Sequence, residues 1–359
     1  MGLWLTTDSH FGVKNSSPEW LSSMIDYYRK VFIELVRKHG KKDDILIHCG
    51  DVFDNRTTLN IDVMNRVMDL FDDFSGLFKE VHIVTGNHDI YKKKRNTPNS
   101  LRPLSYMNNV HVHDEEFHCV NIEGKRVAFM PWNHSPEKER EVLSKIKYSD
   151  YLFGHTSVIG ALYSGTRRVD ENHGNKPEQF GDFGQVYTGH IHTSQLIKNV
   201  RFLGSPYELT RNDRNNPKSA WYLDLPTGKE TSFQNKYSPM YLSLDIADVQ
   251  GASVEKIKRM VGNNFIDLNV DTSKIETKEL RKTLDSLYEA TDNVKVVSVD
   301  KTPIVEEEDL INIKTESGDI PTVIEYISKK ISSDIKNDKS REAMQKLMNT
   351  LYKKHIDSL

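Results

Sequence analysis

Seven side chains of the types that bind divalent metals stand in five short motifs within the first 192 residues. Each motif follows a short apolar stretch typical of a buried β-strand, so the side chains should emerge from the ends of five strands. Donors of this kind and number can hold two ions that share one carboxylate, and such pairs attack phosphoesters. The motifs are Asp8-Ser9-His10, Gly50-Asp51, Gly86-Asn87-His88-Asp89, Gly154-His155 and Gly189-His190-Ile191-His192.

The spacing within the motifs indicates which donors work together. Asp8 and His10 stand two apart, as do His190 and His192, and residues with this spacing at a strand end point to the same side. Asp51 follows a glycine, which permits a sharp backbone path, and its two oxygens can bridge two ions. Carboxylates mixed with imidazoles suit Mn²⁺, Fe²⁺ or Zn²⁺ better than Ca²⁺. The remaining two candidates, an amide and an imidazole, are Asn87 and His155.

His88 differs from the other candidates because it neighbours Asn87, so its side chain should point away from the metals and toward a substrate. We expect it to stabilise the transition state or to give a proton to the leaving oxygen. Asp54, three residues after Asp51, is placed to orient His88 by a hydrogen bond. The alternative is that Asp54 only caps its loop.

A second histidine-rich stretch has the composition of a zinc site, with His111, His113, His118 and Cys119. The alternation Val-His-Val-His at 110–113 is instead typical of a half-exposed strand whose polar residues face outward. We therefore assign no metal to this stretch.

The pattern of apolar residues predicts the elements that position the motifs. Strands are expected at 3–7, 45–49 and 81–85, with helices at 18–39 and 59–74 between them. The helix at 59–74 is apolar nearly all round, so it needs a second burial partner besides the core, and a second subunit would provide one. Later strands are shorter, and only 136–146 has a helical pattern. This order favours a layered α/β sandwich over a simple doubly wound sheet.

The domain organisation follows from the same patterns. Residues 1–238 are predicted to form the domain that carries the motifs, and 239–300 a small α/β module. Residues 301–319 contain a proline and a run of four acidic residues, which is a linker composition. Residues 320–359 carry two amphipathic helical stripes that bury little on their own, so they should dock on a partner.

Composition limits the partners and the location. The 359 residues carry a net charge of −3, so binding to DNA would require a local basic patch. No membrane span or signal peptide is visible and the two cysteines are scattered, so we expect a cytoplasmic protein. The chain has no P-loop motif, which excludes ATP binding of that kind. The candidate DNA contacts beside the motifs are Lys92, Lys93, Lys94, Arg95, Arg167, Arg168, Arg211 and Arg214.

At these motifs the chain resembles the calcineurin-like metallophosphoesterases, which implies a four-layer α/β/β/α sandwich. Within that family it is similar to the SbcD-type nuclease subunits of double-strand-break repair complexes, and its length and C-terminal layout are most similar to the T-even phage recombination nuclease subunits. The motifs cover residues 8–207, and the match beyond them rests on position and pattern. The segments that carry the closer resemblance are Gly50-Asp51-Val52-Phe53-Asp54, Gly86-Asn87-His88-Asp89, Met130-Pro131-Trp132 and Leu203-Gly204-Ser205-Pro206-Tyr207.

The resemblance implies an Mn²⁺-dependent DNA exonuclease and endonuclease for end processing, recombination and repair, with Mg²⁺ as a weaker substitute. His88 would be the catalytic histidine. Dimers would form through helices near the nuclease core, which agrees with 59–74. Residues 239–300 would cap DNA, 320–359 would bind the coiled coil of an SbcC-type ATPase, and a phage protein would work in the host cytoplasm. The first ion would be held by Asp8, His10, Asp51 and His192, and the second by Asp51, Asn87, His155 and His190.

Two rival functions share the same motifs. A phosphoesterase for a small nucleotide or another phosphodiester would use the same core, but it would need neither the linker nor the helix pair. A catalytically idle scaffold would be expected to have lost a ligand, and none of the seven is missing.

Overall fold

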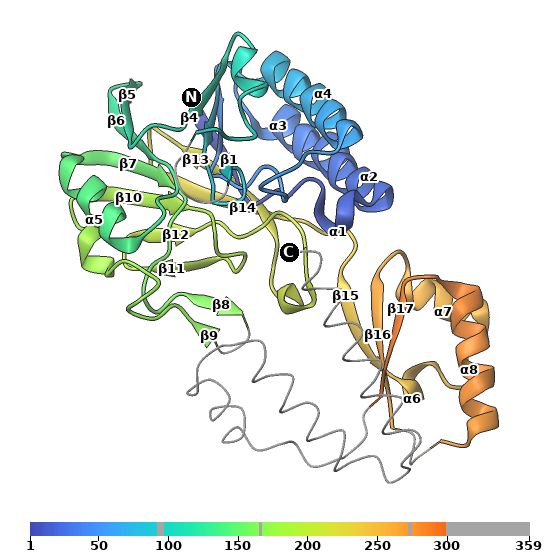
Figure 1. The fold of residues 1–359 in the computed structure, drawn as a ribbon. Coiled ribbons are helices and arrows are strands. Elements are labelled where there is room, and N and C mark those ends of the chain that lie inside the picture. The colour runs from blue at the N-terminus through green and yellow to red at the C-terminus, as the bar shows by residue number, and fades with distance from the viewer. Residues whose placement is uncertain (92–96, 165–166, 272–274, 299–359) are drawn as a thin grey trace, which may run out of the picture. The chain divides into compact units, whose positions relative to one another are not determined.

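The computed structural model describes residues 1–91, 97–164, 167–271 and 275–298. Two six-stranded mixed sheets make up much of this part of the chain, and Figure 1 shows helices on their outer faces. The predicted linker at 301–319, the helix pair at 320–359 and the basic run at 92–95 lie outside the described residues.

The first sheet has the strand order β14-β13-β1-β2-β3-β4. Its four strands β1 to β4 run parallel, and β13 pairs with β1 in the antiparallel sense. Side chains alternate between the two faces, so Leu3 and Leu5 face the second sheet whereas Trp4 packs against helices. The strands are β1 (Gly2–Thr6), β2 (Ile45–His48), β3 (Val81–Val84), β4 (Val110–His113), β13 (Ser219–Asp224) and β14 (Lys229–Gln234).

Helices cover the outer face of the first sheet (Figure 1). The helix predicted at 18–39 forms as α2 (Pro18–Tyr27), one π-helical turn η1 (Tyr28–Phe32) and α3 (Ile33–His39), preceded by the short α1 (Val13–Ser16). The helix α4 (Ile61–Leu77) begins at Asn60, whose side chain accepts hydrogen bonds from two amides of the first turn. Its buried side chains Val63, Val67, Leu70, Phe71 and Phe74 face the sheet.

The second sheet has the order β11-β12-β10-β7-β6-β5, with β6, β7, β10 and β12 parallel. The helix α5 (Pro136–Lys145) packs on its outer face through Val142 and Leu143. The strands are β5 (His118–Ile122), β6 (Lys125–Met130), β7 (Ser149–Gly154), β10 (Phe183–Thr188), β11 (Gln195–Ile197) and β12 (Val200–Phe202). Shorter elements are the hairpin β8 (Leu162–Ser164) and β9 (Arg167–Arg168), and the 3₁₀ turns η3 (Leu104–Tyr106), η4 (Pro177–Phe180) and η5 (Arg211–Asp213).

Three apolar clusters fill the spaces between the layers. One lies between the helices and the first sheet, one between the two sheets, and one between the second sheet and α5. The middle cluster joins Leu5 and Ile47 of the first sheet to Phe129, Phe153 and Tyr187 of the second. This arrangement confirms the predicted α/β/β/α sandwich.

A third sheet follows the sandwich in sequence, with the strand order β15-β16-β17. Three helices complete this α/β module around a separate apolar cluster that includes Ile257, Leu268 and Leu287. Its elements are β15 (Tyr241–Asp245), α6 (Ile246–Val249), α7 (Val254–Val261), β16 (Phe265–Val270), α8 (Thr277–Ala290) and β17 (Val294–Ser298). Among the described helices, none is both long and apolar enough to span a membrane.

Candidate metal centre

The seven candidate ligands all lie just beyond the carboxyl ends of β1, β2, β3, β7 and β10. The five following loops meet across the two sheets. His155, after β7, donates a hydrogen bond from Nδ1 to the carbonyl of Cys49 at 2.7 Å, and the amide of His190 donates to Asp8 Oδ1 at 3.1 Å. The end of the sandwich where parallel strands finish therefore collects the donors.

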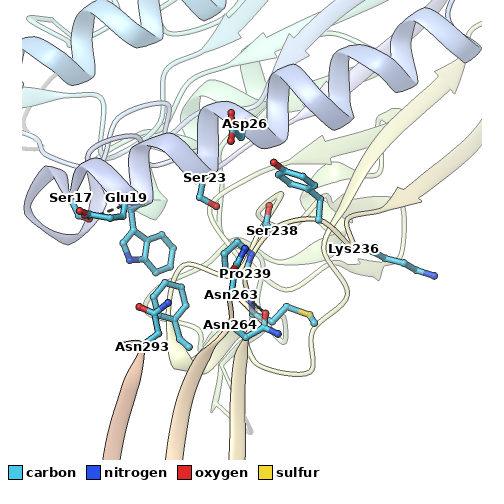
Figure 2. A pocket seen from close by; sticks show the side chains of 14 residues that line it. Ser17, Glu19, Ser23, Asp26, Lys236, Ser238, Pro239, Asn263, Asn264 and Asn293 are labelled. Atoms are coloured by element: carbon cyan, nitrogen blue, oxygen red, sulfur yellow. Dashed lines mark hydrogen bonds between the residues drawn. The ribbon is translucent and has the colours of Figure 1, made fainter. Parts of the chain in front are cut away.

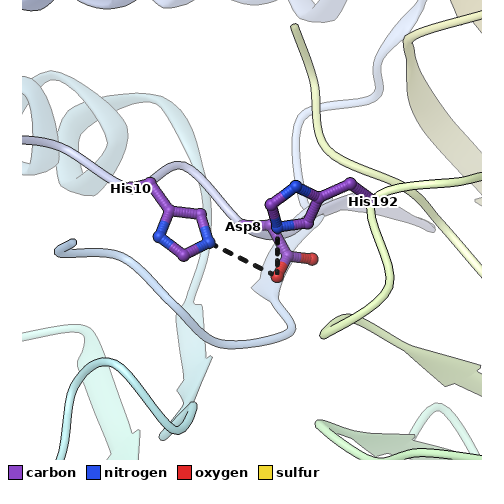
Figure 3. Close-up of side chains that lie close together, drawn as sticks. All are labelled: Asp8, His10 and His192. Atoms are coloured by element: carbon purple, nitrogen blue, oxygen red, sulfur yellow. Dashed lines mark ion pairs between the residues drawn. The ribbon is translucent and has the colours of Figure 1, made fainter. Parts of the chain in front are cut away.

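The first group of donors consists of Asp8, His10 and His192, whose ligand atoms lie within 4.8 Å of one another. Figure 3 shows the three side chains facing one another, with Asp8 Oδ1 3.9 Å from Nε2 of each histidine. Asp51 Oδ2 lies 3.6 Å from His10 Nε2, so this carboxylate adjoins the group as well.

The second group consists of Asp51, His155 and His190. Asp51 Oδ2 lies 3.3 Å from His155 Nε2. Asn87 Oδ1 completes the group at 3.1 Å from His155 Nε2 and 2.8 Å from His190 Nδ1. Asp51 therefore belongs to the second group and also lies next to His10 of the first.

The orientation of the histidine rings fits a bound cation. Because a carbonyl oxygen can only accept, Nδ1 of His155 carries its hydrogen, and Nε2 of the neutral ring presents a lone pair to Asp51 and Asn87 oxygens. His10 repeats this pattern, with Nδ1 3.1 Å from Asp54 Oδ1 and a buried Nε2 that has no hydrogen-bond partner. Acceptors that face one another need a positive charge between them.

The charge balance points the same way. Asp8 and Asp51 are buried, and neither forms an ion pair with any described Lys or Arg. Burial alone would lower the pKa of His155, but the Asp51 carboxylate outweighs it and raises that pKa to about 9. Without an ion, a proton therefore supplies the missing charge, and a metal would displace it. This donor set fits two divalent cations.

Strained backbone places several of these ligands. Asp8, His10, Asp51 and His190 have φ values of 50°, 47°, 56° and 76°, which lie in the left-handed region. Such conformations cost about 1–3 kcal/mol each and persist only where surrounding contacts impose them. Gly86 makes room for this geometry, because a Cβ there would collide with the amide nitrogen and carboxylate of Asp51.

Asp89 is a supporting residue that sequence reasoning quoted in its motif without assigning a role. Its buried carboxylate accepts hydrogen bonds from the amides of Asp51 at 2.9 Å, Phe53 at 3.1 Å and Gly86 at 2.9 Å. Burial, together with the charge of Asp51, raises the pKa of Asp89 to about 7. This side chain joins the loops after β2 and β3, both of which carry candidate ligands.

His88 lies closer to the centre than expected. Its ligand atom is within 4.8 Å of those of His10 and Asp51, and its ring packs edge-on against His10 at 4.7 Å. The rule that neighbouring residues point to opposite sides fails here, because Asn87 and His88 occupy a turn and not an extended strand.

Asp54 contacts His88 as predicted, but it does so through its main-chain oxygen and not through its carboxylate. His88 Nδ1 lies 2.5 Å from the main-chain oxygen of Asp54, whereas the Asp54 carboxylate binds His10. The main-chain contact leaves Nε2 of His88 as the ring atom available to a substrate.

An aromatic and basic surface adjoins the second group. The ring centroid of Trp132 lies 4.6 Å from that of His190. The ring centroid of Tyr163 lies 6.5 Å from that of His190. The exposed Arg167 lies over Tyr163 at 5.8 Å. A cavity of about 260 Å³ is lined by these side chains together with Arg168. The structure thus brings two predicted DNA contacts next to the candidate ligands, and Trp132 is a neighbour that sequence reasoning did not place in the site.

The other two arginines among the predicted DNA contacts have a different environment. Arg211 and Arg214 were predicted to contact DNA, but both guanidinium groups pair with Asp267 of β16. Local sequence could not reveal this pairing, because the carboxylate lies more than 50 residues further along the chain. Both guanidinium groups thus take part in ion pairs within the protein, and their contact with DNA stays a prediction.

His192 has its own support, which the sequence did not suggest. Asp213 Oδ1 lies 3.8 Å from His192 Nδ1 and 2.8 Å from Lys218 Nζ. Burial tends to raise the pKa of Asp213, but His192 and Lys218 together hold it below its ordinary value. Lys218 Nζ also donates to the main-chain oxygen of His192 at 2.8 Å.

Comparison with known proteins agrees with this geometry. The calcineurin-like phosphoesterase family model matches residues 1–241. The chain is 30% identical over 357 residues to exonuclease subunit 1 of Enterobacteria phage T4, with 96% of each chain covered.

Two solved structures align with parts of the chain at low scores. An archaeal phosphodiesterase aligns at 14% identity over 66% of this chain and 100% of its own, with a TM-score of 0.35. The nuclease MPE of Pseudomonas putida aligns at 16% identity over 64% and 87%, with a TM-score of 0.30. The family match and the relative from phage T4 decide the assignment: the chain belongs to the calcineurin-like phosphoesterases and is a metallophosphoesterase.

Proposed function

We propose that this phosphoesterase is a DNA nuclease with exonuclease and endonuclease activity, dependent on two Mn²⁺ ions, that processes DNA ends in recombination and double-strand-break repair. The observation that carries the proposal is the position of Asp51 between two buried groups of donors, with exposed arginines beside the second group. The relative from phage T4, which bears the name of an exonuclease subunit, supports DNA as the substrate.

The residues divide the work as follows. Asp8, His10, Asp51 and His192 would hold one ion and Asp51, Asn87, His155 and His190 the other. When bound, two such ions activate water and neutralise charge on a phosphate. His88, fixed through Nδ1 by the carbonyl of Asp54, would present Nε2 to the phosphate and stabilise charge or pass a proton to the leaving oxygen. Asp89 and the Asp54 carboxylate would keep the ligand loops in place.

The direct test is an assay on labelled linear and circular DNA with Mn²⁺, EDTA or Mg²⁺, beside a small phosphodiester. We expect both DNA forms to be cut with Mn²⁺, less with Mg²⁺ and not in EDTA. His88→Ala should lose cleavage yet bind both ions, whereas His39→Ala, an exposed histidine at the end of α3, should behave like the native chain. Hydrolysis of the small diester without any DNA cleavage would favour the rival phosphodiesterase function.

DNA binding should depend on basic side chains near the centre. Arg167, Arg168 and the run Lys92 to Arg95 would contact phosphates that flank the scissile bond. Removal of one phosphate contact should weaken DNA binding and lower the slope of log affinity against log salt by about one. Arg167→Ala can be compared with Arg126→Ala, an exposed arginine on β6, in fluorescence anisotropy at several salt concentrations. Equal slopes for the two variants would count against Arg167 as a contact.

We also propose that residues 320–359 bind an SbcC-type coiled-coil ATPase and that 239–300 caps DNA. The apolar stripes of the tail and the word subunit in the name of the phage T4 relative support a partner. A chain that ends at Ser317 should keep its nuclease fold and lose ATPase binding in a pull-down. Undiminished binding would place the docking surface in the nuclease domain or the module.

Dimerisation through α4 completes the proposal. Ile61 at the start of this helix is 79% exposed, although the other large apolar side chains of the helix are buried or partly buried against the core. Ile61→Asp should convert a dimer to a monomer in light scattering. Met260→Asp, at a partly exposed apolar position on α7, is the matched control. A native chain that is already monomeric would contradict this part of the proposal.

A further inference from the structure

An ion-paired contact joins the α/β module to the sandwich. Asp267 on β16 is a largely buried carboxylate that accepts from Arg211 Nε at 2.7 and 2.8 Å and from Arg214 Nη2 at 2.5 Å. Arg214 Nε also donates to the main-chain oxygen of Tyr241 on β15 at 3.0 Å. Charge-assisted hydrogen bonds of this kind are short and directional, so they fix both arginines.

The two arginines flank Asp213, the residue that supports His192. Arg211 and Asp213 both belong to η5, and Arg214 follows directly. Asp213 Oδ2 accepts from the Thr210 amide at 2.9 Å and from its hydroxyl at 3.0 Å, which holds the turn closed. The other oxygen, Oδ1, faces His192 and Lys218. A shift of η5 would therefore move the carboxylate that orients the His192 ring.

We propose that Asp267 is a positioning residue for the metal centre: through Arg211 and Arg214 the module holds η5, and η5 holds His192 toward Asp8. The inference rests on the proposed role of His192 as a metal ligand. Outer residues that orient a metal-binding histidine typically change metal affinity about 10- to 100-fold when they are removed. The module would thus act on the Asp8–His10–His192 group while sparing the group that contains His155.

The seam between the sandwich and the module is not filled throughout. A cavity of about 780 Å³ lies there, and Figure 2 shows that residues of α2, of the loop before β15 and of the module line it. Trp20 and Phe265 stack across the seam at 4.8 Å with an interplanar angle of 7°. The stack is an apolar contact, whereas the paired arginines join η5 to Asp267 through directional hydrogen bonds.

Coupling of this kind is reciprocal, so an ion bound by His192 should also steady η5 and its contact with the module. Hydrogen exchange of the amides at 211–214 should slow when Mn²⁺ is added to the native chain. In Asp267→Asn the amides should exchange faster without metal, and added Mn²⁺ should protect them less.

The test is a calorimetric titration of Mn²⁺ into metal-stripped full-length protein. We expect the native chain to bind two ions and Asp267→Asn to bind one of them roughly 3- to 10-fold more weakly, with the other unchanged. Asp267→Glu should restore part of the affinity, because it keeps a carboxylate for both arginines. Asp285→Asn, the same substitution at an exposed position on α8, should bind as the native chain does.

The outcomes separate this inference from the proposed function. A native chain that binds no Mn²⁺ would remove the basis of both. Native binding of two ions together with unchanged affinities in Asp267→Asn would overturn the positioning role alone. Equal weakening of both ions would indicate general loosening of the fold, and it would overturn the proposed path through η5 as well.

Discussion

Lys218 is the buried cation behind the first donor group, and its replacement tests how that group is held. Its side chain and that of Asp213 are each 5% exposed, and Nζ lies 2.8 Å from Asp213 Oδ1. Nζ also donates to the main-chain oxygen of His192 at 2.8 Å and to Ser205 Oγ at 2.9 Å. Lys218→Met preserves most of the volume but leaves the Asp213 carboxylate buried without its cation.

The charge left on Asp213 should decide the size of the effect. Removal of one partner from a buried ion pair costs about 3–5 kcal/mol, whereas a typical hydrogen bond contributes about 1 kcal/mol. We therefore expect the free energy of unfolding of Lys218→Met to fall by about 3–5 kcal/mol at pH 7. The double variant Lys218→Met/Asp213→Asn removes both charges and keeps an acceptor for the turn, so it should recover at least about 2 kcal/mol of that loss.

The assay is urea unfolding of the metal-free protein, followed by circular dichroism. Lys229→Met, at an exposed position of β14, is the matched control and should stay within about 0.5 kcal/mol of the native chain. The reasoning is refuted if Lys218→Met loses less than about 1 kcal/mol, or if the double variant loses the sum of the two single losses.

Burial raises the pKa of Glu139 from 4.5 to about 7, so the folded state favours its neutral form and loses stability as the pH rises through that interval. Glu139→Gln should raise the free energy of unfolding by about 3 kcal/mol at pH 8 and have little effect near pH 4, as urea unfolding at both values would show; equal effects would exclude a titrating carboxyl. Asp51→Asn should weaken both Mn²⁺ ions in calorimetry and His155→Ala only one, and loss of a single ion from the Asp51 variant would contradict its shared role. Mn²⁺ at about 100 times Kd should stabilise the native chain by about 2.7 kcal/mol for each bound ion, seen as a higher Tm that chelation reverses.

The sandwich could be predicted because each of its elements carries a local signal. The short apolar runs 3–5 and 45–47 indicated buried strands, and Leu3 and Trp4 enter different apolar clusters. The π-helical turn Tyr28–Phe32 was not predictable from the same pattern, because one turn with an extra residue leaves the apolar stripe of a long helix nearly unchanged. The pattern therefore predicted that a helix forms, but it gave the ends of that helix only approximately.

The candidate ligands could be found because their motifs directly follow strands, whereas the groups that support them are distant in sequence. Asp267 reaches Arg211 across 56 residues. His113 shows the same limit: it was expected to face outward, yet it is 7% exposed and stacks on Phe129 at 3.9 Å. Alternation separates the two faces of a strand, but it does not reveal that the second sheet covers one of them.

The metal centre is organised by contacts between protein atoms. Asp8 and Asp51 hold left-handed backbone conformations whose cost must be met by their surroundings. Three amides bind Asp89, and the Tyr207 hydroxyl donates to the main-chain oxygen of Ser9 at 2.7 Å, between the ligands of the first motif. Because these bonds join protein atoms alone, we expect the donors to keep their positions without a metal. Chelation should therefore remove only the free energy of metal binding and leave the chain folded, unlike a structural metal site whose loss unfolds the domain.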